Sequence, residues 1–325
     1  MLMIVLGAVF SVRGEMTAGE FIAFISYNAM LTHPVRALGR MISEMSKAGV
    51  SIERILYIMN SEEEQDCENA VTPNMAGDIV FEHVSFSYGE ELVLDDISFT
   101  IPKGTTFGIL GSTGSGKSTL MYLLNRLYDL PKENGRITIG GVDIADMKGE
   151  WVRSHIGMVL QEPYLFSRTI AENIGITKKE YSLSEIRKVA EIACLDDTVM
   201  DFAHGYDTIV GERGVTLSGG QKQRTAIARM LTQKTPIMVF DDSLSAVDAD
   251  TDARIRQELH KNLGDSTVIL IAHRVTTLMK ADCIMVMDQG RIAELGSHQE
   301  LMEKQGIYKK IYDMQMSLGE DENNG

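Results

Sequence analysis

The stretch "FGILGSTGSGKSTL", residues 107–120, constrains the fold of this chain more than any other. An apolar run at 107–110 is followed by the pattern Gly-x-x-x-x-Gly-Lys-Ser at 111–118 and then by a helical segment. This order is typical of a phosphate-binding P-loop, because glycines let backbone amides turn toward a phosphate and the helix start adds positive potential. The sequence therefore predicts an α/β P-loop NTPase.

Two side chains of the P-loop have specific expected roles. Lys117 can reach the β- and γ-phosphate oxygens of a nucleotide, and the Ser118 hydroxyl can bind Mg²⁺. A P-loop alone is compatible with a kinase, a GTPase or a motor protein, so other residues must decide among them. The residues expected to contact the nucleotide are Gly111, Ser112, Thr113, Gly114, Ser115, Gly116, Lys117, Ser118 and Thr119.

A second apolar run, residues 237–240, ends in two adjacent carboxylates, Asp241 and Asp242. A run of this length and composition is typical of a buried strand. A P-loop fold needs a carboxylate at the end of a neighbouring strand to hold Mg²⁺. Asp241 therefore fits that role, and Asp242 requires a separate explanation.

The stretch "LSGGQ" at 217–221 opens an amphipathic helix far along the chain from the P-loop. A serine and two glycines at a helix start form a further anion-binding site, suited to a γ-phosphate held by another P-loop. Here the sequence resembles the ATP-binding cassette (ABC) family, whose signature motif is LSGGQ and whose cassettes dimerise head to tail. The signature residues are Leu217, Ser218, Gly219, Gly220 and Gln221.

Further motifs of the ABC family occur in the expected order. The resemblance implies that Tyr88 stacks on adenine, that Gln161 contacts Mg²⁺ and senses the membrane domain, and that His273 contacts the γ-phosphate. Residues 210–214 resemble the exporter X-loop, and residues 243–248 match the D-loop. The implied fold is a RecA-like core with an antiparallel β-subdomain and an α-helical subdomain, and the implied ligands are ATP and Mg²⁺. The implied Mg²⁺ ligands are Ser118, Gln161 and Asp241.

Asp242 departs from the family pattern, which places a catalytic glutamate at this position. Aspartate is one methylene shorter, so its carboxylate falls short by about 1.5 Å, and misplacing a catalytic group by about 1 Å can cost roughly 10²-fold in rate. We therefore expect the site, with Asp242, His273 and Gln161 as its catalytic residues, to bind ATP and hydrolyse it poorly. With an intact signature, this resembles one half of a heterodimeric exporter. A homodimer in which Asp242 acts more slowly remains the alternative.

Residues 20–60 predict one long helix, preceded by a capping box at Thr17. Its length of roughly 60 Å is about twice the hydrocarbon thickness of a membrane, and Pro34 predicts a kink. Hydropathy alone favours an amphipathic helix in water. The resemblance to exporters implies instead that residues 1–60 are the remnant of a transmembrane domain, namely the end of its fifth helix, an extracellular turn and its sixth helix. The chain would then be an N-terminally truncated half-transporter.

Charge and composition predict the domain boundaries. The net charge is −15, of which residues 1–60 carry +1, and this balance argues against nucleic-acid binding. An acidic linker is expected at 61–78, the nucleotide-binding domain at 79–318, and an acidic disordered tail at 319–325.

The resemblance also implies a location and partners. The intact protein is expected to cross the plasma membrane several times, with a cytoplasmic nucleotide-binding domain, and to contact membrane lipid. The expected partner is a second ABC half-transporter, with a heterodimer favoured. The transported substrate is unknown, although multidrug efflux is the commonest assignment in the family. Less favoured are a soluble ABC ATPase and a regulatory subunit that binds ATP without hydrolysing it.

Overall fold

The computed structural model describes residues 2–61, 63–243, 247, 249–262, 264 and 266–323. The chain forms two compact units, Met1–Gln65 and Asp66–Gly325, and each is described by itself.

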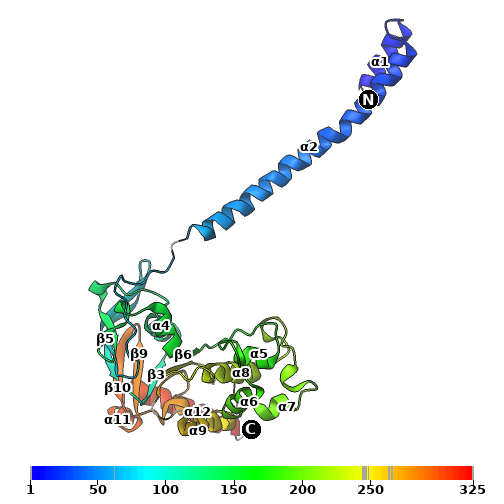
Figure 1. Ribbon diagram of the computed structural model, residues 1–325. Helices are drawn as coiled ribbons and strands as arrows, with labels where there is room; N and C mark the ends of the chain where they lie inside the picture. Colours follow the sequence, from blue (N-terminus) through cyan, green and yellow to red (C-terminus); the bar gives the residue numbers. More distant parts are fainter. Residues whose placement is uncertain are drawn as a thin grey trace. The chain divides into compact units, whose positions relative to one another are not determined.

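The first unit consists of α1 (Leu2–Val12) and α2 (Ala18–Met59), which pack together near their connecting turn (Figure 1). A Cβ atom at Gly7 would lie 2.5 Å from Cε2 of Phe21, so glycine permits this close approach. The predicted capping box at Thr17 is confirmed, and α2 continues through Pro34 as one long helix. None of the residues of α2 is buried. Across the described residues, no helix combines the length and the apolar character needed to cross a membrane.

The second unit is built on a six-stranded sheet in the order β10-β9-β3-β8-β7-β6. Its five neighbouring strands β9, β3, β8, β7 and β6 are parallel, and β10 pairs antiparallel at the edge. Their sequences are nearly continuous apolar runs because both faces of a parallel sheet are covered. The bounds are β3 Thr106–Gly111, β6 Ile156–Val159, β7 Ile237–Asp241, β8 Thr267–Ala272, β9 Cys283–Asp288 and β10 Arg291–Gly296.

A second, antiparallel sheet in the order β2-β1-β4-β5 packs against the first one through a shared apolar core. The rings of Phe99 and Phe107, one from each sheet, stack at a centroid distance of 5.4 Å. The bounds are β1 Ile79–Tyr88, β2 Glu91–Ile101, β4 Arg136–Ile139 and β5 Val142–Asp143. The predicted antiparallel β-subdomain is confirmed.

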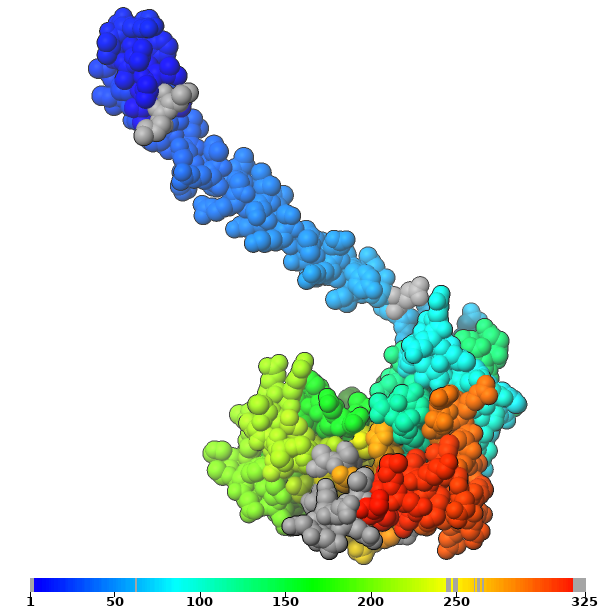
Figure 2. Space-filling model, turned by 180° about the vertical axis from the view of Figure 1, so that it is seen from behind, coloured from blue at the N-terminus to red at the C-terminus, as the bar shows by residue number. Residues whose placement is uncertain are grey.

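A helical group, α5 to α8, extends from the sheet (Figures 1 and 2). Its buried apolar residues belong to a cluster that also includes one face of the sheet and residues of α9 to α12, and this cluster is distinct from the core between the two sheets. This confirms the predicted α-helical subdomain and the α/β P-loop fold. The helices of the unit are α3 Lys117–Leu124, α4 Gly149–His155, α5 Ile170–Gly175, α6 Leu183–Ile192, α7 Asp196–Met200, α8 Gly219–Leu231, α9 Ala249–Asn262, α10 Val275–Leu278, α11 His298–Lys304 and α12 Ile307–Asn323. Short 3₁₀ turns occupy η1 Lys132–Asn134, η2 Ile144–Asp146, η3 Gly205–Asp207 and η4 Glu212–Gly214.

Residues 66–78 belong to the second unit, whereas composition predicted a linker over 61–78. Val71 pairs with Met147, and the indole N–H of Trp151 donates to the Pro73 carbonyl at 2.9 Å. Met75 is buried. The acidic composition with Pro73 and Gly77 indicated a linker, but these specific contacts attach residues 66–78 to the second unit.

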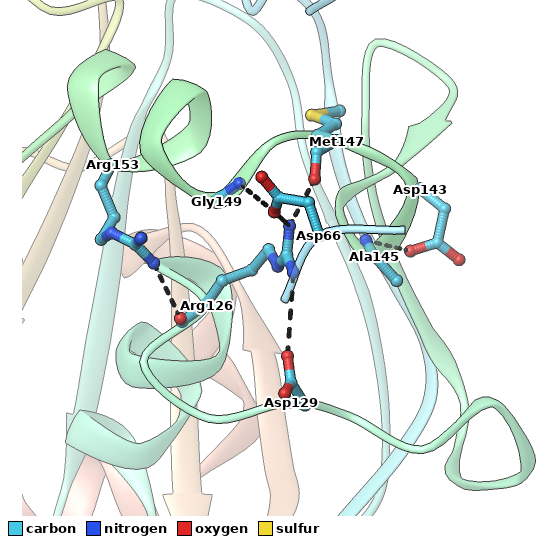
Figure 3. Close-up of polar contacts among 8 residues, drawn as sticks. All are labelled: Asp66, Arg126, Asp129, Asp143, Ala145, Met147, Gly149 and Arg153. Atoms are coloured by element: carbon cyan, nitrogen blue, oxygen red, sulfur yellow. Dashed lines mark hydrogen bonds and ion pairs between the residues drawn. The ribbon is translucent and has the colours of Figure 1, made fainter. Parts of the chain in front are cut away.

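Asp66, the first residue of this segment, contacts Gly149 and Arg126 (Figure 3). Its Oδ1 accepts from the Gly149 amide at 2.8 Å and lies 3.3 Å from Nη1 of Arg126. The Arg126 guanidinium is buried and also donates to the Met147 carbonyl. Because Lys148 gives α4 no side-chain cap, Asp66 supplies the carboxylate that this helix start favours. The hydrogen bond from the Gly149 amide is the main cause that lowers the pKa of Asp66. The charge of Arg126 acts in the same direction, and desolvation opposes both.

The C-terminal residues also differ from expectation. Helix α12 continues through Asn323, whereas residues 319–325 were expected to be disordered. Adding a residue to an existing helix costs far less than starting one, so an acidic composition need not end it at once. Residues 324 and 325 lie outside the described part of the chain.

Candidate nucleotide-binding site

The P-loop connects the end of β3 with the start of α3, as the sequence predicts. Gly116 is the N-cap of α3 and has a left-handed φ of 96°. A Cβ atom there would lie 2.6 Å from Cδ2 of Leu94, so both conformation and space require glycine. No side chain caps α3. Its first amides can therefore bind an anion.

Lys117 and Ser115 give this loop a cation and an available hydroxyl. The Lys117 side chain is buried, and Nζ donates to the carbonyls of Gly111 at 2.9 Å and Ser112 at 2.7 Å. Burial lowers the pKa of Lys117, and the charges of Asp241 and Asp242 oppose that shift. The Ser115 hydroxyl is buried without a hydrogen-bond partner among the described residues. Such an orphaned buried hydroxyl beside a lysine and an uncapped helix fits a phosphate group.

Ser118 and Asp241 meet as predicted, although 123 residues separate them. The Ser118 hydroxyl donates to Oδ2 of Asp241 at 2.9 Å. Asp241 is buried at the end of β7, and burial raises the pKa of its carboxyl, while Ser118 and Lys117 act in the opposite direction. A hydroxyl and a carboxylate are hard oxygen ligands, and Mg²⁺ is usually held by one or two carboxylates together with substrate phosphates. This pair therefore fits Mg²⁺ bound with a nucleotide.

Asp242 has a different backbone environment from Asp241. Its φ is 45°, a left-handed conformation that aspartate tolerates better than most residues. Its amide donates to the Ile271 carbonyl at 2.9 Å, which ties Asp242 to β8. Strand β8 leads directly to His273, whose charge contributes to lowering the pKa of Asp241. The structure thus brings the two aspartates and His273 to the same end of the sheet.

Gln161 follows the edge strand β6. Its main-chain carbonyl accepts from the Gln223 side chain at 3.3 Å, which connects this loop to α8. The Gln161 side chain is exposed, and among the described residues no recorded hydrogen bond joins it to Ser118 or Asp241. Its expected contact with Mg²⁺ stays a prediction.

The signature residues begin helix α8. Ser218 forms a capping box with Gln221: the Gln221 amide donates to Ser218 Oγ at 3.3 Å, and the Ser218 amide donates to Gln221 Oε1 at 2.8 Å. Leu217 is buried, whereas Ser218 and Gly219 are exposed. The described structure records no hydrogen bond between these residues and the P-loop. Their predicted role toward a partner's ATP is therefore untested.

Two other motifs are described only in part. The turn η4 lies in the X-loop, where Arg213 has a left-handed φ of 52°. In the D-loop, residues 244–246 and 248 lie outside the described residues.

Tyr88 lies at the end of β1 among aromatic side chains that sequence reasoning missed. Its ring is 38% exposed and meets the Tyr128 ring edge to face at a centroid distance of 5.1 Å. Phe86 is buried and contacts both rings. Tyr128 follows α3, so the aromatic cluster adjoins the P-loop helix. The nearness of Tyr128 to the P-loop motif in the sequence could have indicated it.

Gln315 in α12 is a second residue that sequence reasoning missed. Its side-chain amide forms two hydrogen bonds to the main chain next to Arg274, one with the His273 carbonyl and one with the Val275 amide. These partners lie 42 and 40 residues away, so no local pattern indicates them.

Comparisons with known proteins agree with this geometry. A sequence model of the ABC transporter family matches residues 94–245. YknU of Bacillus subtilis (strain 168), an uncharacterised ABC transporter ATP-binding protein, is 41% identical over 313 residues, covering 95% of this chain and 53% of YknU. The alpha-hemolysin translocation ATP-binding protein HlyB of Escherichia coli is 38% identical, covering 95% of this chain and 44% of HlyB.

A solved structure is also similar. A bacterial Atm1-family ABC exporter with ATP bound gives a TM-score of 0.78 at 35% identity, covering 92% of this chain and 53% of that chain. This chain thus spans about half the length of the relatives that it matches. The P-loop, the Ser118–Asp241 pair, the signature helix and these similarities together show that the chain carries an ATP-binding domain of the ABC transporter family.

Proposed function

We propose that this chain is the ATP-binding/permease subunit of an ABC exporter, in which ATP binding and hydrolysis drive export of a substrate across a membrane. The observation that carries the ATP site is the Ser118–Asp241 hydrogen bond at 2.9 Å beside the buried Lys117. The similarity to an exporter structure over 92% of the chain supports the transport role.

The residues of the site have separate tasks in this proposal. Lys117 and the amides of the P-loop bind the phosphates, and Tyr88 stacks on adenine. Ser118 and Asp241, with Gln161, would hold Mg²⁺, and the ion would supply positive charge against the phosphates. His273 donates to the γ-phosphate. The signature helix start at Ser218 closes on the ATP of a partner subunit.

Asp242 makes the chain's own site a poor hydrolase in this proposal. Its amide is bonded to the Ile271 carbonyl, so the main chain cannot shift forward to make up for the missing methylene without breaking that bond. The shorter side chain leaves the attacking water less well oriented than a glutamate would. We therefore favour a heterodimer in which the partner's site performs most of the hydrolysis.

The test is the ATPase rate of the purified full chain and of Asp242→Glu and Asp242→Asn variants. We expect slow hydrolysis by the wild type and an increase toward roughly 10²-fold in Asp242→Glu, because the longer side chain restores the reach of the general base. Asp242→Asn, which has nearly the same shape without the charge, should remain slow. Rapid hydrolysis by the wild type alone, abolished in Asp242→Asn, would instead establish a competent homodimer.

The domain roles form part of the same proposal. Residues 1–60 contribute to a transmembrane domain that contacts lipid in the plasma membrane, and the domain that begins at Asp66 lies in the cytoplasm. YgaD of Bacillus subtilis (strain 168), whose name provisionally describes a multidrug export ATP-binding/permease protein, is 38% identical over 310 residues, covering 94% of this chain and 53% of YgaD. HlyB is named for translocation of a protein toxin. Partition of the full chain into detergent, compared with a chain that starts at Asp66, tests the membrane role.

A further inference from the structure

The turn that carries His273 is held at both ends by other parts of the chain. At the end of β8, the Ile271 carbonyl accepts from the Asp242 amide at 2.9 Å. Beyond His273, α10 starts at Val275, and its N-cap residue Arg274 provides no side-chain cap. The turn therefore depends on a group from elsewhere in the chain to satisfy its main-chain atoms.

Gln315 supplies that group, because its side-chain amide both donates and accepts a hydrogen bond. Its Nε2 donates to the His273 carbonyl at 2.7 Å, and its Oε1 accepts from the Val275 amide at 2.9 Å. Both distances are those of good hydrogen bonds. The Gln315 side chain is half-buried, and its helix α12 packs against α10, so the amide does not need to be ordered anew when nucleotide binds.

We propose that Gln315 is a positioning residue that fixes the main chain around His273, so that the imidazole meets the γ-phosphate of ATP in the right place. This inference rests on the proposed function, because it assigns Gln315 to the same ATP site. Gln315 touches no nucleotide and acts only through His273. The consequence is specific to the γ-phosphate: ADP, which lacks it, gains nothing from a well-placed His273.

The discrimination between Mg-ATP and Mg-ADP tests the proposal without depending on the rate of hydrolysis. The Kd of each nucleotide is measured by calorimetry for the full chain and for Gln315→Met, which is similar in shape and has no amide. We expect the Kd of Mg-ATP to rise about 2- to 10-fold, which corresponds to the net free energy that one hydrogen bond contributes. The Kd of Mg-ADP should be unchanged.

Three further variants make the test sharper. Gln315→Glu can still accept from Val275 and cannot donate to the His273 carbonyl, so it should also lose affinity for Mg-ATP. Met314→Ala changes the preceding, exposed residue of α12 and should leave both Kd values at those of the wild type. Combined with His273→Ala, Gln315→Met should have no further effect, because the residue that it positions is gone.

Several results would overturn the proposal. One is an unchanged ratio of the two Kd values in Gln315→Met, and another is an equal loss of affinity for both nucleotides, which would indicate a structural role alone. A persisting effect in the His273→Ala background would also refute it. If the wild type binds no Mg-ATP, the proposed function itself fails, whereas normal binding with an unaltered Gln315→Met variant removes only this inference.

Discussion

Helices α3 and α8 both begin next to glycine and both belong to phosphate-binding motifs, but their first turns are completed differently. Helix α3 starts at Lys117 after Gly116, has no side-chain cap, and lies beside the buried carboxylate of Asp241. Helix α8 starts at Gly219, and Ser218 and Gln221 cap it reciprocally. The first helix start leaves its amides available to a group from outside the chain, and the second is already partly satisfied.

The two helix starts also differ in how many groups for a bound phosphate the same chain provides. At α3 the cation, the hydroxyl and the carboxylate proposed to hold Mg²⁺ all come from the same molecule. At α8 the motif offers amides and one hydroxyl on an exposed surface. We therefore expect changes at α3 to affect the chain's own nucleotide and changes at α8 to affect a partner's.

Lys117→Ala should have the largest effect on binding. In the proposed site its ammonium makes charged hydrogen bonds to the phosphates, and removing such bonds costs about 1.5–3 kcal/mol. We expect the Kd of Mg-ATP, measured by calorimetry, to rise roughly 10- to 150-fold. Lys222→Ala, which removes a lysine from the first turns of α8, is the matched control and should change this Kd by less than about twofold. Equal losses of Mg-ATP affinity in Lys117→Ala and Lys222→Ala would contradict the assignment of the chain's own nucleotide to α3.

Tyr128→Ala should have a smaller effect, confined to the adenine end of the site. An edge-to-face aromatic pair contributes about 0.5–1.5 kcal/mol, so a loosened Tyr88 should weaken Mg-ATP binding roughly 2- to 10-fold. Binding of inorganic tripolyphosphate should stay the same, because it has no base. Tyr128→Phe should restore affinity, and Leu127→Ala, at the exposed preceding residue, is the control. Weaker binding of tripolyphosphate would show that the P-loop itself had moved.

Ser218→Ala tests whether the start of α8 contributes to the chain's own ATP site. Loss of an N-cap serine typically costs about 1 kcal/mol, so we expect the free energy of unfolding of the domain to fall by about that amount. The chain's own affinity for Mg-ATP should not change. Denaturant unfolding and calorimetry measure the two quantities. A marked loss of affinity would mean that this helix start contributes to the site of its own chain.

Asp66→Ala should have the smallest effect, because it acts at the start of α4 and beyond the C-terminal end of α3, away from the P-loop. Without this carboxylate, α4 loses its cap, and the amides near Gly149 should exchange with deuterium a few-fold faster. Mass spectrometry of peptides from residues 147–155 measures this exchange. Glu68→Ala, a nearby exposed carboxylate with the same charge change, should leave it unaltered. Identical exchange in the two variants would show that Asp66 does not hold the segment.

The sequence predicted those parts of the molecule that follow from short local patterns or from two motifs that must act together. The P-loop, the start of α2 at Thr17 and the strand before Asp241 all follow from short patterns. Even the contact between Ser118 and Asp241 was predictable, because the chemistry of a P-loop demands a second carboxylate. The antiparallel and helical subdomains were predicted through the family resemblance.

The contacts made by single residues across long separations could not be predicted. Asp66 looked like one more charge in an acidic run, although it caps a helix 83 residues away. Gln315 lies in an ordinary amphipathic helix, and only the packing of α12 on α10 places its amide beside His273. Such positions depend on tertiary packing, which local sequence patterns do not encode.

The docking of residues 66–78 has an optical consequence. Trp151 is the only tryptophan in the chain, and its indole N–H is bonded to Pro73 within that docked segment. If the segment detached, the indole would become exposed to water and its fluorescence emission would shift to longer wavelength. The protein thus contains its own reporter, which allows detachment of residues 66–78 to be followed in real time without an added label.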